Sequence, residues 1–155
     1  MNVLATNCGS STLKFLLVES ERDRRLAKTI IYNLNSAQND VVATMIGNFQ
    51  DGATPGKIQL GSAWWFLDNI DGMTRGMEAL SNSGLLSRFV GMTTDSRSFI
   101  SYVRHEYFRR ILCNLLGSEI ESGLLPKEYG LIGSMVQDIC YRNAARYFDF
   151  GLPVD

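Results

Sequence analysis

Three short β-rich runs begin at intervals of about thirty residues, and this spacing limits the fold more than any other feature of the chain. The runs are KTIIYNL (28–34), GKIQLGSAWWF (56–66) and SRFVGMTT (87–94), each bounded by turn-forming residues. About thirty residues is the length of one strand followed by one helix, so strands at this interval are typically parallel and joined by right-handed crossovers. The spacing therefore predicts an α/β fold with about three parallel strand–helix units.

Helical patterns separate the runs. Residues 39–49 and 71–84 carry apolar side chains at every third or fourth position, which is the spacing of one helix face. Asn39 or Asp40 is available to cap the first helix, and Gly84 suits the position just after the second. Strand and helix patterns thus alternate as a parallel sheet requires.

After the third run the pattern becomes purely helical. Residues 104–117 place apolar side chains on one broad side, and we expect this helix to end at Gly117. Residues 125–151 continue at the same spacing, with Pro126 near the helix start. These helices need a sheet to cover, which the expected strands provide.

Composition narrows the classes of function. A chain of 155 residues with 45% apolar residues can bury a core, and 15 basic against 16 acidic side chains leave a formal net charge of -1. We therefore expect no nucleic-acid partner and no attraction to acidic membranes. No apolar run approaches the roughly 18–20 residues that cross a bilayer, and no signal-peptide pattern opens the chain. The sequence therefore predicts a cytoplasmic protein.

Residues that commonly bind metals are scarce. Cys8, Cys113 and Cys140 show no zinc-type spacing, and we interpret them as small buried side chains. The chain has 1 histidine, His105. Because a catalytic zinc site usually needs several protein ligands, some of them imidazoles, this chain by itself is not expected to build one.

Polar and aromatic residues that follow the expected strands are the candidates for function, because active sites of parallel α/β folds lie at the carboxyl ends of strands. These residues are Asn33, Asn35, Trp64, Trp65, Asp95 and Arg97. Asp95 and Arg97 lie two positions apart, so they point in roughly the same direction and can share a ligand. Alternatively, Asp95 or Ser96 caps a short helical turn, and at least one of the adjacent indoles is core packing.

A basic cluster begins the next helical pattern. Arg104, Arg109 and Arg110 surround His105. An arginine can bind a carboxylate through two hydrogen bonds, although exposed helix arginines commonly have no specific partner. We interpret His105 as a surface or capping residue rather than a catalyst.

Longer segments carry a family resemblance. The segments are KTIIYNLN (28–35), ATMIGNFQDGATPGKIQLGS (43–62), GSAWWF (61–66), GLLSRFVGMTTDSRSFISY (84–102) and RHEYFRRILCNLLG (104–117). Together they closely resemble the C-terminal portion of uronate isomerase, a family of the amidohydrolase superfamily, over about residues 28–150. The resemblance implies part of a metal-dependent (β/α)8 barrel that interconverts aldose and ketose uronates such as D-glucuronate and D-fructuronate.

The resemblance also implies roles for single residues. It makes the runs barrel strands six, seven and eight, and it makes Asp95 a metal ligand that can relay protons. Arg97 falls at the substrate carboxylate, and Trp64 and Trp65 fall on a substrate-binding tryptophan pair. The implied cofactor is a divalent metal, zinc, and the implied partner is a small uronate. The family's histidine ligands are missing from this chain, so we expect no bound metal and no activity in isolation.

The match to this family has local and global departures. Thr93 stands where the family usually has leucine and Val103 where it usually has proline, so the loop after the third run is expected to take a different path. A complete barrel takes about 250 residues, so the 155 residues present have room for roughly three of its eight units.

The beginning of the chain resembles a different family. NVLATNCGSSTLKFLLVE (2–19) is similar to the N-terminus of acetate kinase, which implies phosphate-binding roles. The matching polar positions are Asn7, Ser10, Thr12 and Lys14. The alternative is a structural β-hairpin over about residues 1–20, placed against an open sheet edge.

The sequence leaves several functions open. The favoured hypothesis is a uronate isomerase fragment over 28–150, inactive alone and preceded by the 1–20 hairpin, with one compact domain formed by both as the alternative. A recombined or engineered chimera without catalysis would instead fold or self-assemble, as a homo-oligomer through open sheet edges. A small acetate-kinase-like protein that binds phosphate or nucleotide is the remaining alternative.

Overall fold

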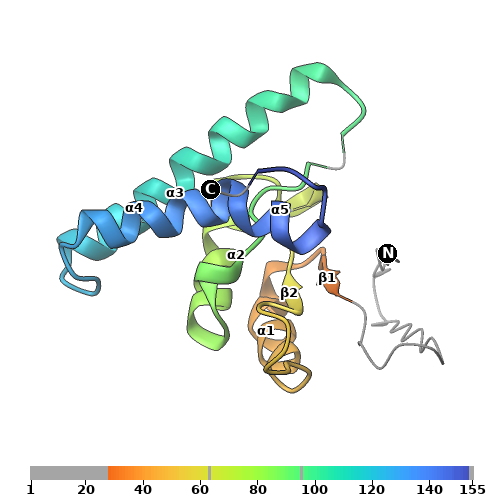
Figure 1. The fold of residues 1–155 in the computed structure, drawn as a ribbon, viewed down its shortest axis with the longest axis horizontal. Helices are drawn as coiled ribbons and strands as arrows, with labels where there is room; N and C mark the ends of the chain where they lie inside the picture. The colour runs from red at the N-terminus through yellow and green to blue at the C-terminus, as the bar shows by residue number, and fades with distance from the viewer. Residues whose placement is uncertain (1–27, 63, 95, 154–155) are drawn as a thin grey trace.

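The computed structural model describes residues 28–62, 64–94 and 96–153 and has a mixed α/β fold. In this part of the chain a 2-stranded parallel sheet pairs β1 (Thr29–Ile31) with β2 (Ile58–Leu60) (Figure 1). The register sets Ile30 opposite Gln59. The helix α1 (Asn39–Gly47) follows β1 and precedes β2 along the chain, so it forms the crossover connection that two parallel strands require.

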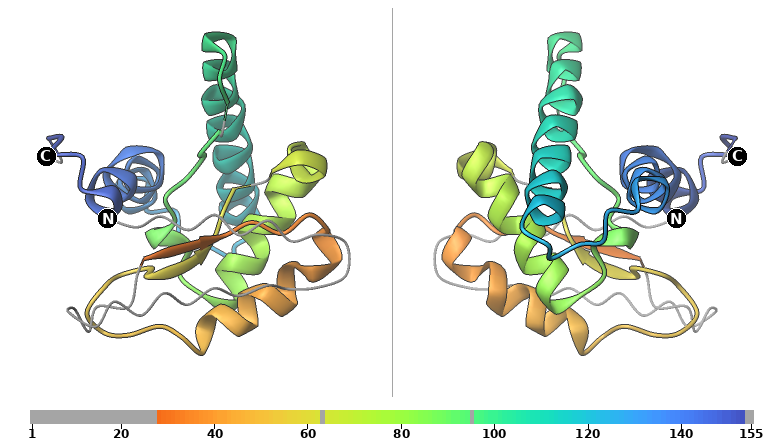
Figure 2. Two further views of the ribbon diagram at one scale, coloured as in Figure 1. Left: turned by 90° about the vertical axis from the view of Figure 1, so that its right-hand side faces the viewer. Right: turned by 90° about the vertical axis from the view of Figure 1, so that its left-hand side faces the viewer.

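Both faces of the small sheet are covered. Ile31 and Leu60 pack in one apolar cluster with residues of α1 and of α2 (Ile70–Ser83). The neighbouring Ile30 packs on the other face, with Tyr147 of α5 (Asn143–Phe148). Figure 2 shows the strands between these two groups of helices. Successive side chains along a strand point to opposite faces of the sheet, so Ile30 and Ile31 pack into the apolar clusters on the two different faces.

The third expected strand is absent from the described residues. Residues 89–94 run beside β2, but the N–H of Val90 donates to Oε1 of Gln59 at 2.9 Å, and the N–H of Thr93 donates to Oγ of Ser62 at 3.2 Å. Side-chain acceptors thus take bonds that a parallel ladder would give to backbone carbonyls. The prediction of three strands is therefore wrong for the described chain, which has two.

The start of α1 also differs from expectation. Gln38, not Asn39 or Asp40, precedes the helix, because the 3-10 turn η1 (Ser36–Gln38) leads directly into it. Asn35 caps that turn, and its Oδ1 accepts from the N–H of Ala37 at 3.0 Å. The prediction that Asn39 or Asp40 caps α1 is therefore wrong: Gln38 at the cap position makes no side-chain capping bond, and the capping side chain, Asn35, acts on the preceding turn.

The helix α3 (Val103–Glu121) passes the end expected at Gly117. Leu116 and Ile120 are buried, so the apolar face continues beyond that glycine. The helix ends before Gly123, whose φ of 79° is left-handed and whose N–H donates to the carbonyl of Ile120 at 3.2 Å. Burial of the next turn outweighs the modest cost of one glycine inside a helix, about 1 kcal/mol.

The last helical segment is divided. α4 (Tyr129–Gln137) begins after the start expected near Pro126, and the π-helical turn η5 (Asp138–Arg142) joins it to α5.

Among the described residues no helix is both long and apolar enough to cross a membrane.

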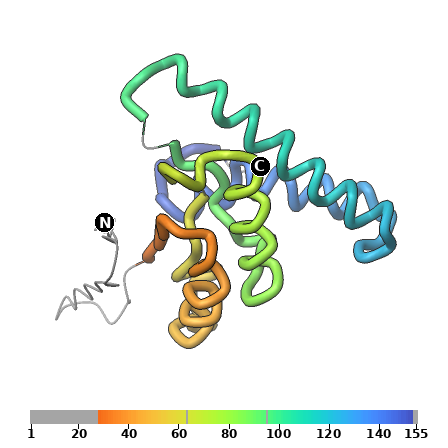
Figure 3. The backbone as a smooth tube through the Cα atoms, turned by 180° about the vertical axis from the view of Figure 1, so that it is seen from behind, coloured from red at the N-terminus to blue at the C-terminus, as the bar shows by residue number. Residues whose placement is uncertain are grey.

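The largest apolar core lies between α2, α3 and the C-terminal helices. Its buried members are Met73, Met77, Leu80, Leu86, Phe89, Met92, Phe108, Leu112, Leu116, Ile120, Ile132 and Ile139. The face of α2 that the sequence predicted is confirmed, and so is the end of that helix at Gly84. Figure 3 shows α1 and α2 side by side, and α3 extends beyond the rest of the body at its N-terminal end.

The cysteines do not all lie in this core. Cys113 is exposed and Cys140 is half-buried, so the prediction of a buried side chain is wrong for Cys113. Because Cys113 directly follows the core residue Leu112, helix geometry turns it about 100° away from the buried face. Cys8 lies outside the described residues.

The amino-terminal end of the sheet has a structural role. Lys57 is buried and forms an ion pair with Asp51, and its backbone carbonyl accepts from the hydroxyl of Tyr147 at 2.9 Å. Lys28 Nζ donates to the backbone carbonyl of Tyr147 at 2.6 Å. Burial raises the pKa of the Tyr147 hydroxyl, which therefore remains a donor. These contacts fasten α5 to the sheet and leave the opposite, carboxyl end for a site.

Candidate functional site at the carboxyl ends of the strands

Tyr32, directly after β1, connects the segments expected to carry the site. Its hydroxyl shares a hydrogen bond with Oγ1 of Thr93, and its ring meets that of Trp64 edge-on, with centroids 6.4 Å apart. Gly61 makes room for this ring, since a Cβ there would lie 2.2 Å from Cε1 of Tyr32. The chain after β1, after β2 and before Asp95 therefore meets at one edge. No sequence pattern indicated Tyr32, because its role depends on contacts between segments that are distant along the chain.

The asparagines after β1 serve the backbone. Asn33 is buried, and its Nδ2 donates to the carbonyl of Asn35 at 2.8 Å and to Oδ1 of Asn39 at 2.6 Å. Asn35 caps η1. Both amides thus shape the turn from β1 into α1.

The tryptophan pair forms an aromatic surface after β2. Trp64 and Trp65 stack with centroids 5.4 Å apart and an interplanar angle of 18°, and Phe66 meets Trp65 edge-on. Trp65 opens the 3-10 turn η2 (Trp65–Leu67) with a φ of 52° and is largely exposed. Of the two indoles, Trp64 is half-buried against Tyr32 and so fits the packing alternative in part, whereas Trp65 is the exposed member of the pair. Exposed aromatic faces suit ligand contact.

The loop after Thr94 carries the acid and base of the prediction. Asp95 lies outside the described residues. Arg97 is exposed and takes part in none of the ion pairs of the described chain. The short helical turn that was the alternative does follow, as η4 (Phe99–Tyr102), but its cap is Ser98, whose Oγ accepts from the N–H of Ile100 at 3.3 Å. Ser96 instead shares a hydrogen bond with the hydroxyl of Ser101.

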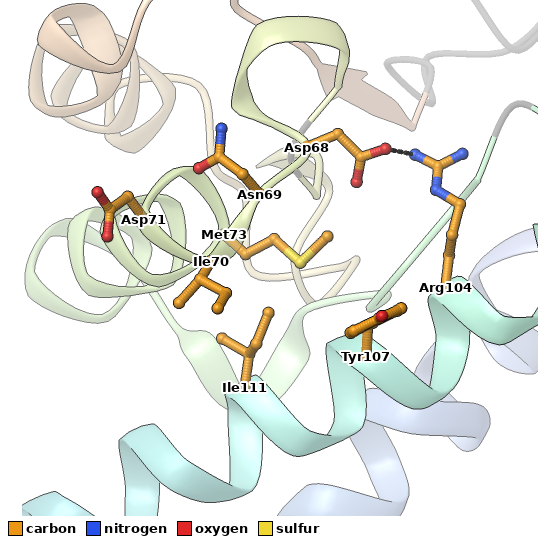
Figure 4. A pocket seen from close by; sticks show the side chains of 8 residues that line it. All are labelled: Asp68, Asn69, Ile70, Asp71, Met73, Arg104, Tyr107 and Ile111. Atoms are coloured by element: carbon orange, nitrogen blue, oxygen red, sulfur yellow. Dashed lines mark hydrogen bonds and ion pairs between the residues drawn. The ribbon is translucent and has the colours of Figure 1, made fainter.

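Arg104 joins the two loops that flank this edge. From the first turn of α3, Nη1 donates to the backbone carbonyl of Thr94 at 2.6 Å, and Nη2 forms an ion pair with Oδ2 of Asp68 (Figure 4). Its Nε is buried without a hydrogen-bond partner in the described part of the chain. The sequence placed Arg104 in a basic cluster, but no local signal linked it to Asp68, which lies 36 positions away.

A pocket of about 570 Å³ opens beside the ion pair, between the start of α2 and the first turns of α3. It is lined by Asp68, Asn69, Ile70, Asp71, Met73, Arg104, Tyr107 and Ile111 (Figure 4). Asn69 is occupied as the cap of α2, since its Oδ1 accepts from the N–H of Gly72 at 2.8 Å. The remaining lining combines three apolar side chains with three charged ones and the phenol of Tyr107: the apolar ones are Ile70, Met73 and Ile111, and the charged ones are Asp68, Asp71 and Arg104.

Metal ligands do not gather in the described residues. Within these ranges no group of histidine, cysteine, aspartate and glutamate side chains is placed to hold a metal ion. His105 lies on α3, where Arg104 and Arg109 act on it as positive charges and would oppose a bound cation. The donors that the structure describes therefore do not fit a catalytic metal centre.

His105 has an altered protonation equilibrium. Partial burial lowers its pKa below the ordinary value of 6.5, and the charges of Arg109 and Arg104 lower it further. The folded chain therefore binds a proton at His105 less readily than the unfolded chain does.

This difference predicts a pH dependence of stability. Below pH 6.5 the unfolded state binds more protons at His105 than the folded state does. The contribution of His105 to the free energy of unfolding is therefore fully present above pH 6.5 and is lost as the pH falls through the folded pKa. We expect urea titrations of the native chain between about pH 5 and pH 7.5 to show this decrease, and His105→Gln to remove part of it. Asn114→Gln, an exposed change on the same helix, should keep the native slope. An unchanged slope in His105→Gln would contradict the assignment.

The residues implied in phosphate binding cannot be placed. Asn7, Ser10, Thr12 and Lys14, like the hairpin expected over 1–20, lie outside the described residues.

A family comparison covers nearly the whole chain. Residues 1–148 match the family model described as glucuronate isomerase. This match includes residues 1–19, so the resemblance of that stretch to acetate kinase is not supported.

Individual relatives agree with the family match. The uronate isomerase of Cellvibrio japonicus is 62% identical over 129 residues, which are 83% of this chain and 27% of that protein. The uronate isomerase of Phocaeicola vulgatus is 65% identical over 127 residues, 81% of this chain and 27% of that protein. The Bacillus subtilis uronate isomerase is 61% identical over 135 residues, 87% of this chain and 28% of that protein. The chain thus spans little more than a quarter of the length of these curated relatives.

Solved structures show the same correspondence. The uronate isomerase crystal structure from Thermotoga maritima matches with a TM-score of 0.70 and 30% identity, over 83% of this chain and 27% of that chain. The glucuronate isomerase from Caulobacter crescentus matches with a TM-score of 0.67 and 22% identity, over 83% of this chain and 26% of that chain, which shows the fold alone. The chain corresponds to one segment of these enzymes and belongs to the glucuronate isomerase family.

Proposed function

We propose that this chain supplies part of the active site of a uronate isomerase that interconverts D-glucuronate and D-fructuronate. The contact of Tyr32 with both Trp64 and Thr93 carries the proposal, because it gathers the expected strand ends at one edge. Residues 28–150 would form the C-terminal part of a (β/α)8 barrel, with β1, β2 and the 89–94 run in the sixth to eighth strand positions.

The proposed roles follow from side-chain chemistry. Moving hydrogen between adjacent carbons needs a group that takes up and returns a proton, and the carboxylate of Asp95 is suited to this. Arg97 is exposed and would bind the uronate carboxylate through two hydrogen bonds. Trp64 and Trp65 would contact the sugar ring. The donors of the described residues do not fit the family's metal, so the proposed roles belong to side chains alone.

The proposal predicts activity only when the rest of the enzyme is supplied. We expect no isomerase turnover from the folded chain alone, with zinc or manganese added. Mixing it with the part of the Bacillus subtilis uronate isomerase that it does not match should give turnover. Asp95→Asn should lower this turnover by about 100-fold or more, because a general acid–base group contributes at least that much.

The control is Asp149→Asn, an exposed change at a left-handed position that asparagine tolerates, and it should retain the activity. Turnover by the chain alone would overturn the claim that its site is incomplete. A complex that forms on gel filtration but shows no turnover would overturn the assignment of the site.

Self-association without catalysis is the second candidate. Phe99 and Ile100 of η4 are 85% and 84% exposed, and clustered exposed apolar residues commonly mark interaction surfaces. Gel filtration of the unmixed chain in the same experiment separates this candidate from the first, since a homo-oligomer would elute early. The family match over residues 1–148 gives no support to a chimera joined near residue 20.

A further inference from the structure

Arg104 ties together two loops that the proposed site needs in a fixed relation. We propose that Arg104 is a positioning residue, which holds the tryptophan pair after β2 in place relative to the loop that carries Asp95 and Arg97. The catalytic consequence rests on the proposed function, whereas the link between the loops is a property of the chain itself.

The link has two arms from one guanidinium. Nη1 donates to the carbonyl of Thr94, the residue before Asp95, at 2.6 Å. Nη2 pairs with Asp68, whose own N–H donates to the carbonyl of Trp65 at 3.1 Å. One side chain therefore links the turn that begins at Trp65, through Asp68, with the carbonyl of Thr94 just before Asp95.

Burial and anchoring make this link stiff. The side chains of Arg104 and Asp68 are 24% and 25% exposed, so both arms are shielded from most solvent, where charged hydrogen bonds are stronger than in water. Arg104 lies in the first turn of α3, and the next turns of that helix place Phe108 and Leu112 in the main core. A site supported by a packed helix is held more precisely than one supported by loops alone.

The other arginines of the cluster offer a contrast. Arg110 is exposed and pairs with Glu106 one turn away on its own helix, so it joins no loops. Arg104 also keeps its Nε buried without an acceptor in the described chain, which is unfavourable unless the two Nη contacts offset it. Lysine cannot replace this arrangement, because an ammonium lacks the rigid fork that reaches two separated acceptors.

Hydrogen–deuterium exchange of the intact chain tests the link directly. In Arg104→Met, which keeps most of the aliphatic stem, we expect amide exchange to rise about tenfold in peptides spanning both 64–69 and 93–98. Exchange in β1 and α1 should remain native. Arg110→Met is the matched control and should leave both loop peptides unchanged, and Arg104→Lys should rescue them only in part.

A second variant separates the two arms. Asp68→Asn removes only the charged partner, so exchange should rise in 64–69 and much less in 93–98, where the bond to Thr94 persists. The 2 tryptophans of the chain, Trp64 and Trp65, add a spectroscopic measure, since acrylamide should quench their emission more in both variants. If Arg104→Met does not fold by circular dichroism, Asp68→Asn and Arg104→Lys decide the question.

The outcomes distinguish this inference from the proposed function. Loops that exchange in Arg104→Met as they do in Arg110→Met would overturn the positioning role, and so would loosening of α3 as a whole without a specific response of the loops. A different result would separate the two claims. If exchange rises in the two loop peptides of Arg104→Met, but the native chain mixed with the rest of the enzyme shows no turnover, the positioning role stands and the proposed function is overturned.

Discussion

Leu112→Ala is expected to lower the free energy of unfolding by about 2–5 kcal/mol. Leu112 is 0% exposed and lies in the main core, between α2 and the C-terminal helices. The loss is the transfer free energy of the removed isopropyl group plus the free-energy cost of the cavity that its rigid neighbours leave unfilled. Urea unfolding followed by circular dichroism would measure it, and typical domains have only about 5–15 kcal/mol to lose.

Leu124→Ala is the matched control for this change. Leu124 is 76% exposed, just beyond the end of α3, so the same chemical deletion should change the free energy of unfolding by no more than about 0.5 kcal/mol. Equal effects at the two leucines would show that Leu112 is not buried as described.

Gly91→Ala is expected to destabilise the chain comparably, for a different reason. Gly91 has a φ of 73°, a left-handed conformation that costs other residues about 1–2 kcal/mol. A Cβ there would also lie 2.4 Å from the backbone carbonyl oxygen of Ile139, which is part of a packed helical turn. Relief requires movement of backbone, so we expect about 1–3 kcal/mol in addition, measured by the same urea titration.

Gly117→Ala should have the opposite sign. Gly117 lies inside α3 with nothing within 4 Å of its ideal Cβ, and alanine there is expected to stabilise the chain by about 0.5–1 kcal/mol. A neutral or stabilising Gly91→Ala would contradict the close approach of residues 89–94 to η5.

Local pattern predicted much of the fold correctly. The repeat of Met73, Met77 and Leu80 followed by Gly84 defined both the buried face and the end of α2, because helix periodicity and glycine capping depend on neighbours a few positions away. The cores of the first two β-rich runs are strands and pair in parallel, as their spacing predicted.

The third run shows where local pattern was insufficient. Its apolar residues are buried as a strand's would be, yet Gln59 and Ser62 supply the acceptors for its backbone and Gly91 breaks the extended conformation. Burial and ladder pairing favour the same residue types, so composition alone cannot separate them.

The candidate site likewise contains residues that the sequence indicated and contacts that it did not indicate. The sequence indicated Trp64, Trp65, Asp95 and Arg97 from their positions after expected strands, and these assignments remain predictions. It missed Tyr32 and the pair of Arg104 with Asp68, because an interaction between side chains 36 positions apart has no short-range signature.

The sequence by itself determined the α/β class, the buried face of α2 and the kinship with uronate isomerase, since these depend on residue type and spacing along the chain. Only the tertiary structure decided which polar groups satisfy one another. In the folded chain the side chains of Asn33 and Asn35 bind backbone groups, and Trp65 is exposed. Arg104 pairs with Asp68 beside the candidate site, whereas Arg110 pairs with Glu106 on its own helix. The physical reason is that hydrogen bonds and ion pairs act over a few ångströms in space, whatever the distance between the partners in sequence.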